Sequence, residues 1–437
     1  KTLRYKLIIL LLLVFVALMS SCSLEEEDSI IEPEPEKEPI IITEEMPIID
    51  HEEPSEVIIE RVILPPVEQE KANTNYKPLF EGQTRVSGTK TMMEYNVEIL
   101  SKNLKSPWGI ALLPDGRLII TEKAGNIRLV SQDGVVGNQI GGFPKVDSRT
   151  QGGLLDIAPA PNFEESRMLY FTLAESTARG SLTAVGKGRL SDDEDVIENF
   201  EIIWRAYPYY DNSMHFGSRL LFDADSNIFV TTGERSDLAT RPKAQQLDSA
   251  YGKVIHITTD GEPVEDNPFI GEEGVLPEIY SLGHRNVQGI AIHPVTGDIW
   301  ISEMGPRGGD ELNLIKPGLN YGWAVISYGI EYSGKPIPGA LTVKEGMEQP
   351  VYYWDPVLAP SGMCFYTSDL IPEWKNNLFI GGLKSQHIAR LIIEDNLVVA
   401  EERILENEGQ RFRDICEGPE GALYAITDEG RLYKISP

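Results

Sequence analysis

A set of polar side chains stands at one recurring position in this sequence, the start of a short apolar segment that follows a turn. The set comprises Gln151, His215, Arg285, Asn286, Gln288, Ser361, Arg411 and Arg413. A neutral imidazole is a base poised near physiological pH, so His215 is the candidate general base. The competing interpretation is a core histidine bonded to backbone, which needs no polar companions at the other segment starts.

Three of these residues, Arg285, Arg411 and Arg413, carry a positive charge in a chain that is acidic overall. Arginines usually extend from strands toward solvent, and that is the alternative for each of them. Three guanidinium groups at the same recurring position instead predict a multiply anionic ligand held by forked hydrogen bonds. Lys384 follows the apolar segment 376–383 and is a weaker candidate for the same site.

An oxygen-rich stretch contains Gly305 and Pro306, followed by Asp310, Glu311 and Tyr321. Carbonyl and carboxylate oxygens are the ligands that calcium prefers, so the stretch is a candidate calcium site. The alternative is a solvated loop. No His or Cys cluster in the sequence has zinc spacing, no Gly-rich loop precedes a helix, and no serine elbow is present.

The segments that must position these residues read as β-strands, because short runs of Val, Ile, Leu and Tyr alternate with turn residues from about residue 91. A unit of strand, turn and strand recurs six times, with markers 44 to 73 residues apart at Gly109, Gly153, Gly217, Gly289, Gly362 and Asp414. This spacing fits four-stranded blades with insertions. We therefore predict an all-β fold, a six-bladed β-propeller over residues 91–437, rather than a β-sandwich.

The propeller fold explains how residues far apart in the sequence can act together. In a propeller the innermost strand of each blade begins near the central axis, so the polar segment starts are expected to meet at one axial opening. The functional site is predicted there. Residues 95–100 are expected to complete the last blade and close the ring.

Residues 1–21 combine three basic side chains with an apolar run from Leu7 to Met19 and small residues before Cys22. This pattern is typical of a secretory signal peptide, and the run is too short to cross a hydrocarbon core of roughly 30 Å comfortably. Because small residues lead directly into Cys22, the segment resembles a bacterial lipoprotein signal with Cys22 as the lipidated residue. The protein is predicted to be extracytoplasmic and bound to the membrane through a lipid anchor only.

Residues 22–90 are predicted to be a disordered tether, because 24–77 contains 17 acidic and 4 basic side chains and many prolines. The body from Pro78 onward has 51 acidic and 32 basic residues. That balance argues against a nucleic acid partner, since phosphate binding needs a basic face. The cysteines Cys364 and Cys416 could pair or stay as two buried thiols, and both alternatives are open.

Seven ordered motifs run through residues 97–437: SPWGIALLPDG, QGGLLDIA, HFGSRL, GHRNVQGIAIHP, EMGPRGGDELNLI with NYGW, GGLKS and RFRDI. Together they resemble the soluble glucose and aldose sugar dehydrogenases that use pyrroloquinoline quinone (PQQ). The resemblance implies a six-bladed propeller with PQQ and calcium as cofactors. It also implies oxidation of an aldose at C1 to a lactone, with hydride passing to the quinone and electrons then passing to an external acceptor.

The resemblance implies a role for individual residues in cofactor and sugar binding. His215 would remove the proton of the C1 hydroxyl, and Gln151 would contact both quinone and sugar. Tyr332 and Arg285 fall where members of the family approach the sugar. The family's cofactor contacts match Gln151, His215, Arg285, Asn286, Lys384, Arg411 and Arg413.

The resemblance also implies two calcium sites. Gly305 and Pro306 would offer backbone carbonyls to a calcium ion that also binds the cofactor. Glu311 and the Tyr321 carbonyl match a second, structural calcium site.

Two departures and two alternatives qualify the function that the resemblance implies. Met214 stands where the glucose-oxidising relatives carry an acidic residue, so a strict glucose preference is not implied. The acidic tether and lipid signal are additions to the soluble members. The alternatives are a calcium-dependent sugar lactonase, which needs few cationic side chains, and a non-catalytic carbohydrate-binding propeller, which has no need of His215. The sequence does not indicate the sugar, the acceptor, or whether the protein is a monomer or a dimer.

Overall fold

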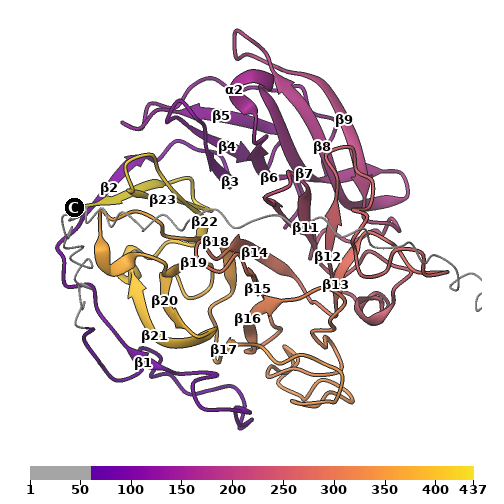
Figure 1. Cartoon of the computed structure of the whole chain (residues 1–437), viewed down its shortest axis with the longest axis vertical. Helices are drawn as coiled ribbons and strands as arrows, with labels where there is room; N and C mark the ends of the chain where they lie inside the picture. Colours follow the sequence, from indigo (N-terminus) through magenta and orange to yellow (C-terminus); the bar gives the residue numbers. More distant parts are fainter. Residues whose placement is uncertain (1–60) are drawn as a thin grey trace, which may run out of the picture. The chain divides into compact units, whose positions relative to one another are not determined.

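The computed structural model describes residues 61–437, which form six β-sheets arranged around a central axis (Figure 1). Five sheets have four or five strands and one has three, and successive sheets follow one another along the chain. The predicted all-β, six-bladed propeller is confirmed. The predicted signal peptide, Cys22 and the tether up to residue 60 lie outside the described residues.

In blades 1 to 4 the strands run in chain order from the axis outward, and in blades 5 and 6 an earlier strand, β1 or β2, is added at the outer edge. Blade 1 comprises β3 (Pro107–Leu112), β4 (Leu118–Glu122) and β5 (Asn126–Val130), and blade 2 comprises β6 (Leu154–Pro159), β7 (Met168–Thr177), β8 (Gly180–Leu190) and β9 (Ile197–Arg205). Blade 3 comprises β10 (Gly217–Phe222), β11 (Ile228–Thr232), β12 (Lys253–Ile257) and β13 (Ile279–Leu282), and blade 4 comprises β14 (Val287–Ile292), β15 (Ile299–Glu303), β16 (Asp310–Ile315) and β17 (Tyr352–Trp354). Blade 5 comprises β18 (Pro360–Phe365), β19 (Leu378–Gly382), β20 (Ile388–Glu394) and β21 (Leu397–Ile404), with β1 (Ser87–Gly88) at its edge. Blade 6 comprises β22 (Phe412–Glu417), β23 (Leu423–Thr427), β24 (Leu432–Ser436) and β2 (Asn96–Ser101). The helical segments are α2 (Phe163–Ser166) and the 3₁₀ turns Arg241–Gln245, Pro372–Trp374 and Glu406–Glu408.

The ring is closed by strands from both ends of the propeller. Strand β2 pairs antiparallel with β24, so Val97 lies opposite Ile435 in blade 6. In Figure 1 the two strands lie side by side near the C-terminus. The prediction that residues 95–100 complete the last blade is therefore confirmed, with the strand at 96–101.

The hydrophobic core is divided among the spaces between neighbouring blades. The six largest clusters of buried apolar side chains each join two adjacent blades, for example Ile119 of blade 1 with Phe171 of blade 2. Fully burying one such side chain stabilises a protein by roughly 1.5–3 kcal/mol. Each blade is thus held mainly by its two neighbours, and this packing fixes the inner strands around the axis.

Every innermost strand shifts register against its neighbour near its start. Such bulges redirect side chains and are common next to active sites. The residues at the equivalent place in the six strands are Gly109, Asp156, Arg219, Gly289, Gly362 and Asp414. Gly153 and Gly217 were therefore the wrong markers for blades 2 and 3, because charged residues take the glycine position there.

A hydroxyl on the second strand bridges neighbouring blades at this bulge. Thr172 accepts a hydrogen bond from the Asp156 N–H at 2.9 Å and donates one to the Ser218 carbonyl of the next blade at 2.8 Å. Thr121 and Thr231 make the corresponding pairs of bonds. These bonds account for the threonines near the ends of the second strands of blades 1, 2 and 3.

Residues 61–90 pack on the outer edges of blades 4 and 5, so the predicted disordered tether is wrong for this part. We call residues 61–90 the N-terminal strap. Its strand β1 pairs in parallel with β21, and Gln83 is fully buried. Figure 1 shows the strap beside β21. The prediction extended the acidic, proline-rich composition of 24–77 over the strap, but residues 61–90 carry three acidic and five basic side chains. Hydrogen bonds to blades 4 and 5 order these residues.

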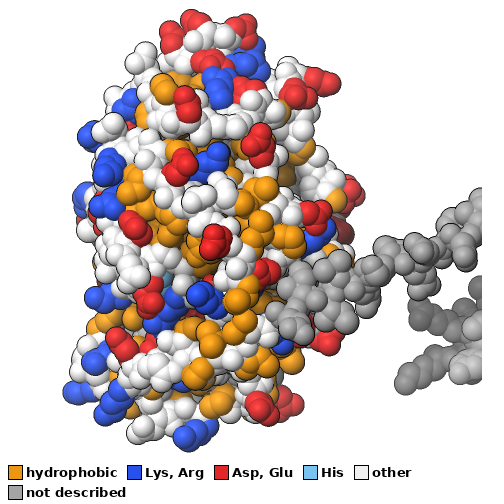
Figure 2. Space-filling view, turned by 90° about the vertical axis from the view of Figure 1, so that its left-hand side faces the viewer, with side chains coloured by type: hydrophobic (Ala, Val, Ile, Leu, Met, Phe, Trp, Pro, Cys, Tyr) orange, Lys and Arg blue, Asp and Glu red, His pale blue; other side chains and the backbone are white. Residues whose placement is uncertain are grey.

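Charged and apolar side chains share the visible surface, and the two cysteines of residues 61–437 are free. On the side seen in Figure 2, acidic and basic side chains are interspersed with apolar ones. Between residues 61 and 437, no helix is long and apolar enough to span a membrane. Cys364 on β18 and Cys416 on β22 are both free thiols. Burial raises the pKa of the Cys364 thiol well above its usual range, and the neighbouring Cys416 adds to this effect.

Candidate active site at the axial opening

A cavity of about 350 Å³ lies where the innermost strands begin. All six blades contribute to its lining, which includes Ser106, Trp108, Lys123, Gln151, Phe216, Asn286, Gln288, Ala359, Leu383, Arg411, Arg413 and Asp428. The cavity falls within the roughly 300–1,000 Å³ typical of small-molecule sites. The structure thus brings together five of the predicted polar residues, Gln151, Asn286, Gln288, Arg411 and Arg413.

The cavity has an excess of positive charge. Arg411 and Arg413 both bind the carboxylate of Asp428, at 2.8 and 2.7 Å. Burial alone would raise the pKa of Asp428, but Arg413 and Arg411 outweigh burial and hold that pKa below its usual value. Lys123 is a third cation of the lining. One carboxylate facing three cations leaves the cavity suited to a ligand with several negative charges.

His215 lies beside this cavity and is only 4% exposed. Its Nδ1 is 2.6 Å from Oε1 of Glu234, and the Ser236 N–H donates to the same oxygen at 3.1 Å. Because that oxygen is an acceptor, Nδ1 carries the imidazole proton and Nε2 keeps its lone pair. Burial and the charge of Arg285 lower the pKa of His215 to about 4, although Glu234 opposes this shift. The imidazole is therefore neutral at physiological pH.

The backbone around His215 is fixed by two close contacts. Its N–H donates to Oε1 of Gln151 at 2.7 Å, and its φ of 50° lies in the left-handed region. Gly233 passes so close to the His215 carbonyl that a Cβ there would collide with it. These contacts hold the imidazole just before the start of β10, in one orientation relative to Gln151.

A second cavity, of about 500 Å³, is lined by Arg285, Pro306, Glu234 and Tyr332. Arg285 is buried and donates through Nη1 to the carbonyls of Met304 and Gly305, at 2.8 and 2.6 Å. Its buried Nε has no partner among the described residues. The Tyr332 side chain is 71% exposed. The structure therefore groups Arg285, Pro306 and Tyr332 next to the carboxylate that binds His215.

The candidate calcium residues surround a group of buried oxygen atoms. Asn313 donates through Nδ2 to Glu303 and Glu311, both at 3.1 Å, while its buried Oδ1 has no partner within residues 61–437. Burial raises the pKa of Glu311 well above its usual value, and the nearby Glu303 raises it further. Glu303, Glu311 and Gly305 line a space of about 10 Å³. Crowded carboxylates and an unpaired amide oxygen fit a hard cation such as calcium.

The described part of the chain contains no group of three His, Cys, Asp or Glu side chains placed to hold a metal ion. A cation bound near Glu311 would therefore need amide or carbonyl oxygens in addition to the two carboxylates. Tyr321 is not among the residues that line the small space. Its ring stacks on His284 at 5.0 Å, and His284 binds Glu303 at 2.9 Å.

Lys384 is a predicted cofactor contact that lines neither the first nor the second cavity. Its side chain is exposed, whereas the preceding residue, Leu383, lines the cavity. The turn after β19 therefore directs Leu383 inward and leaves Lys384 outside the lining.

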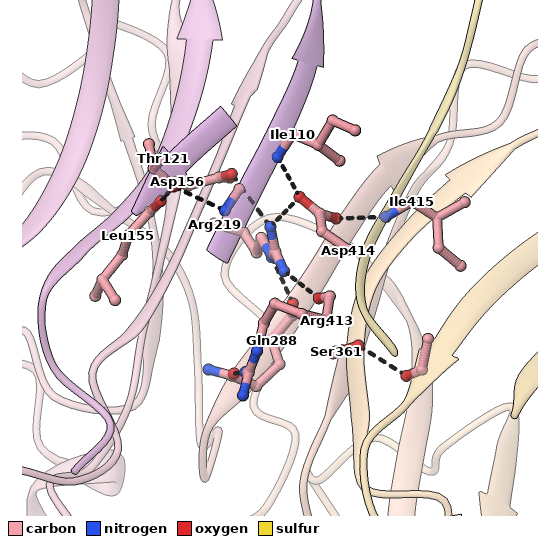
Figure 3. A network of polar contacts seen from close by, with 12 residues as sticks. Ile110, Thr121, Leu155, Asp156, Arg219, Gln288, Ser361, Arg413, Asp414 and Ile415 are labelled. Atoms are coloured by element: carbon pink, nitrogen blue, oxygen red, sulfur yellow. Dashed lines mark hydrogen bonds and ion pairs between the residues drawn. The ribbon is translucent and has the colours of Figure 1, made fainter. Parts of the chain in front are cut away.

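A buried ionic network, drawn in Figure 3, closes the axis beside the cavity. Arg219 lies between Asp156 and Asp414, at 3.1 and 2.6 Å, and its guanidinium stacks on Trp108 at 4.1 Å. It also donates through Nη2 to the Arg413 carbonyl at 3.0 Å. Burial raises the pKa of Asp414 to about 6, and Arg219 opposes that shift. Trp108 and Arg413 belong both to this network and to the cavity lining.

Sequence reasoning missed Glu234, Lys123, Arg219 and Asp156. Glu234 and Lys123 follow the ends of second strands, where Thr-Glu or Gly-Glu recurs. Arg219 and Asp156 are charged residues inside otherwise apolar inner strands. A buried charge needs a partner, so one Arg and two Asp at the bulge positions could have indicated a buried ionic network.

The sequence model of the family described as Glucose / Sorbosone dehydrogenase matches residues 104–434. The chain is 43% identical over 347 residues to the aldose sugar dehydrogenase YliI of Escherichia coli, which covers 78% of this chain and 93% of that protein. It is 26% identical over 413 residues to quinoprotein glucose dehydrogenase B of Acinetobacter calcoaceticus, covering 76% and 85% of the two chains.

Solved structures agree with the sequence relatives. The apo form of the soluble aldose sugar dehydrogenase from Escherichia coli is 43% identical, covers 79% of this chain and 100% of its own, and has a TM-score of 0.75. The PQQ-bound aldose sugar dehydrogenase from Streptomyces coelicolor is 27% identical, covers 78% and 98%, and has a TM-score of 0.64.

Proposed function

The chain belongs to the glucose/sorbosone dehydrogenase family, and from this premise we propose that it oxidises aldoses at C1 to lactones and passes the electrons to an external acceptor. Its relatives make it a PQQ-dependent oxidoreductase that acts on sugars. When bound, PQQ supplies the acceptor for hydride and calcium supplies a Lewis acid. The observation that carries the proposal is the neutral His215 imidazole beside a positively charged cavity to which all six blades contribute.

His215 is proposed as the general base that accepts the proton of the C1 hydroxyl. Its Nε2 is the basic nitrogen, because Nδ1 is committed to Glu234 at 2.6 Å. The Glu234 carboxylate orients the ring and stabilises the imidazolium that forms when the proton arrives. Gln151 holds the backbone of His215 and lines the cavity, so it is placed to contact a sugar or cofactor there.

The cationic lining is proposed to hold the carboxylates of PQQ. Arg411, Arg413 and Lys123 face the cavity, and Asp428 neutralises only part of their charge. Asn286 is held by its bond to the Gly217 N–H at 3.1 Å and lines the same cavity. The unpaired Nε of Arg285 is a further donor that a bound ligand can satisfy. These donors fit a planar acidic cofactor.

Two groups of oxygen atoms are proposed to hold calcium. The Gly305 and Pro306 carbonyls are the family's ligands next to the cofactor, and Gly305 is held by Arg285 and by the Asp310 carboxylate. The buried oxygens of Glu311, Glu303 and Asn313 fit the second ion. Extracytoplasmic location and a lipid anchor at Cys22 remain predictions from the sequence of residues 1–22.

The test is to reconstitute the purified protein with calcium and PQQ and to measure dye reduction over a panel of aldoses. Activity with aldoses that requires both additions supports the proposal. His215→Ala should lower turnover by at least ~100-fold while PQQ still binds, in line with the usual contribution of a general base. Unchanged turnover in His215→Ala, or no aldose oxidation by the reconstituted protein, would contradict it.

A further inference from the structure

The N-terminal strap lies outside the residues that match the family, which begin at 104. It nevertheless contacts the loop 304–309, which carries the Gly305 and Pro306 carbonyls. Asn73 bonds to Arg307 of this loop, and Gln83 bonds to Tyr328 of the neighbouring segment 327–330.

Asn73 joins the strap to this loop directly. Its side-chain Oδ1 accepts a hydrogen bond from Nε of Arg307 at 3.0 Å, and its Nδ2 donates to the Pro356 carbonyl at 3.0 Å. Its backbone N–H donates to the buried Asp355 carboxylate at 2.8 Å. Asn73 is therefore anchored on one side to the connection between blades 4 and 5, and it bonds to Arg307 on the other side.

Gln83 reaches the same loop through Tyr328. The fully buried Gln83 side chain accepts from the Tyr328 hydroxyl at 3.1 Å and donates to the Pro350 carbonyl at 3.0 Å. The Tyr328 ring stacks on Tyr353 of β17 with centroids 4.1 Å apart. Gln83 thus fixes the segment that begins at Tyr328 against the outer strand of blade 4.

The segments 304–309 and 327–330 move as one unit because they are bonded and packed together. Arg307 and Ile330 exchange backbone hydrogen bonds at 3.0 and 3.1 Å. Gly329 packs so closely against the Gly308 carbonyl and Pro306 that a Cβ there would collide. A displacement of Arg307 or Tyr328 must therefore displace Pro306 and its neighbour Gly305.

We propose that Asn73 and Gln83 of the strap are positioning residues for the Gly305 and Pro306 carbonyls. Their hydrogen bonds to Arg307 and Tyr328 hold the two carbonyls in the geometry that binds a divalent cation. The inference rests on the proposed function, because it takes these carbonyls as calcium ligands. The strap thereby makes cation affinity at the Gly305 and Pro306 carbonyls depend on a segment that the matched family region does not include.

The test compares Asn73→Ala and Gln83→Ala with Thr89→Val, a control that removes a strap hydrogen bond, from Thr89 to the Val62 carbonyl, away from the loop. Calcium affinity of the apoprotein is measured by calorimetric titration with calcium chloride, without PQQ. Hydrogen exchange at the Arg307 and Gly309 amides measures the order of the loop without any ligand. Thermal unfolding in chelator measures stability.

Asn73→Ala and Gln83→Ala are expected to weaken calcium binding about tenfold and to speed exchange at both amides by a similar factor. Thr89→Val should change neither calcium affinity nor amide exchange, even if its melting temperature falls by as much as that of the other two variants. Equal calcium affinity and exchange in all four proteins would overturn the positioning role while leaving the proposed function intact. Failure of the parent protein to bind calcium would overturn both. If the loss of calcium affinity follows the fall in melting temperature in all three variants, the strap stabilises the protein as a whole and does not position the carbonyls.

Discussion

The His215–Glu234 pair determines which imidazole nitrogen can meet a substrate. Glu234 receives two hydrogen bonds at one oxygen, from Nδ1 of His215 and from the Ser236 N–H. The ring therefore presents Nε2 as a base, and its pKa of about 4 keeps it unprotonated over the physiological range. A base with so low a pKa is weak, and the charge of Glu234 compensates in part by stabilising the protonated ring.

The first prediction concerns the pH dependence of kcat/KM in the reconstituted enzyme. Activity should be lost as pH falls through about 4, because protonation of His215 removes the base. Glu234→Gln removes a charge that raises the pKa of His215, so the acid limb should move to lower pH while the plateau rate falls about 10–100-fold. An unshifted acid limb in Glu234→Gln would assign that limb to another group.

Sequence reasoning at this scale found side chains whose type is unusual for their position. Gln151, His215, Arg411 and Arg413 are polar where a strand begins. The structure places Gln151, Arg411 and Arg413 in the cavity lining, and His215 lies beside the cavity, bonded to Gln151. Glu234 could not be assigned, because a glutamate after a strand is equally typical of a solvated turn. Leu383 and Lys384 are adjacent, and the structure directs Leu383 rather than Lys384 toward the axis. This choice depends on the turn after β19.

At the scale of strands, the bulged inner strands meet in the buried network of Arg219, Asp156 and Asp414. One guanidinium serves two carboxylates, so the network depends on Arg219. Gly109 and Gly362 leave space for these carboxylates, since a Cβ at either would collide with Asp156 or Asp414. Of the six equivalent positions, three thus carry a charged side chain and three are glycines.

The second prediction is that Arg219→Met lowers the free energy of unfolding by about 3–5 kcal/mol at pH 7, because two buried carboxylates lose their partner. Burial already raises the pKa of Asp414 to about 6, above its unfolded value, so the folded state takes up protons as pH falls. The loss should therefore shrink toward pH 4. Urea unfolding of the parent protein and the variant at pH 7 and at pH 4 measures this loss of stability.

Arg117→Met is the matched control, because Arg117 pairs with Asp115 and Glu194 at the surface. It should cost less than about 1 kcal/mol. If Arg219→Met and Arg117→Met lose equal stability, the axial network does not hold the inner strands.

The strand pattern could be predicted from the sequence, whereas the marker residues could be predicted only in part. Alternation of apolar runs and turns predicted six blades and the closing strand, because both follow from local sequence. Gly153 and Gly217 are glycines in the right region, but register at the bulge depends on pairing with the next strand. The aligned residues are instead Asp156 and Arg219.

At the scale of the whole molecule, the N-terminal strap ties blades 4 and 5 together. It supplies partners to buried acids, including Asp355, which accepts bonds from Asn73 and Thr74. Composition predicted disorder there because it counts charges and prolines. It cannot anticipate that Glu68 of the strap binds Arg403 of β21 at 2.8 Å.

The third prediction is that a chain of residues 91–437 is less stable than a chain of residues 61–437, by on the order of 3 kcal/mol or more. Removing the strap leaves Asp355 without its donors, and each buried unsatisfied group costs about 1–3 kcal/mol. Thermal unfolding of the two chains in the same buffer tests it. Equal melting temperatures would show that the strap only rests on the surface.

The central claim is that cations from separate blades bind one acidic cofactor at the axial opening, and calorimetric titration of PQQ into calcium-loaded apoprotein tests it most directly. The parent protein should bind one equivalent, as should Arg117→Met, which alters only a surface arginine. Arg413→Met should bind at least about tenfold more weakly, because it removes a cavity cation that lies 2.7 Å from Asp428. Equal affinity in the parent and Arg413→Met, or no binding by the parent protein, would contradict the account.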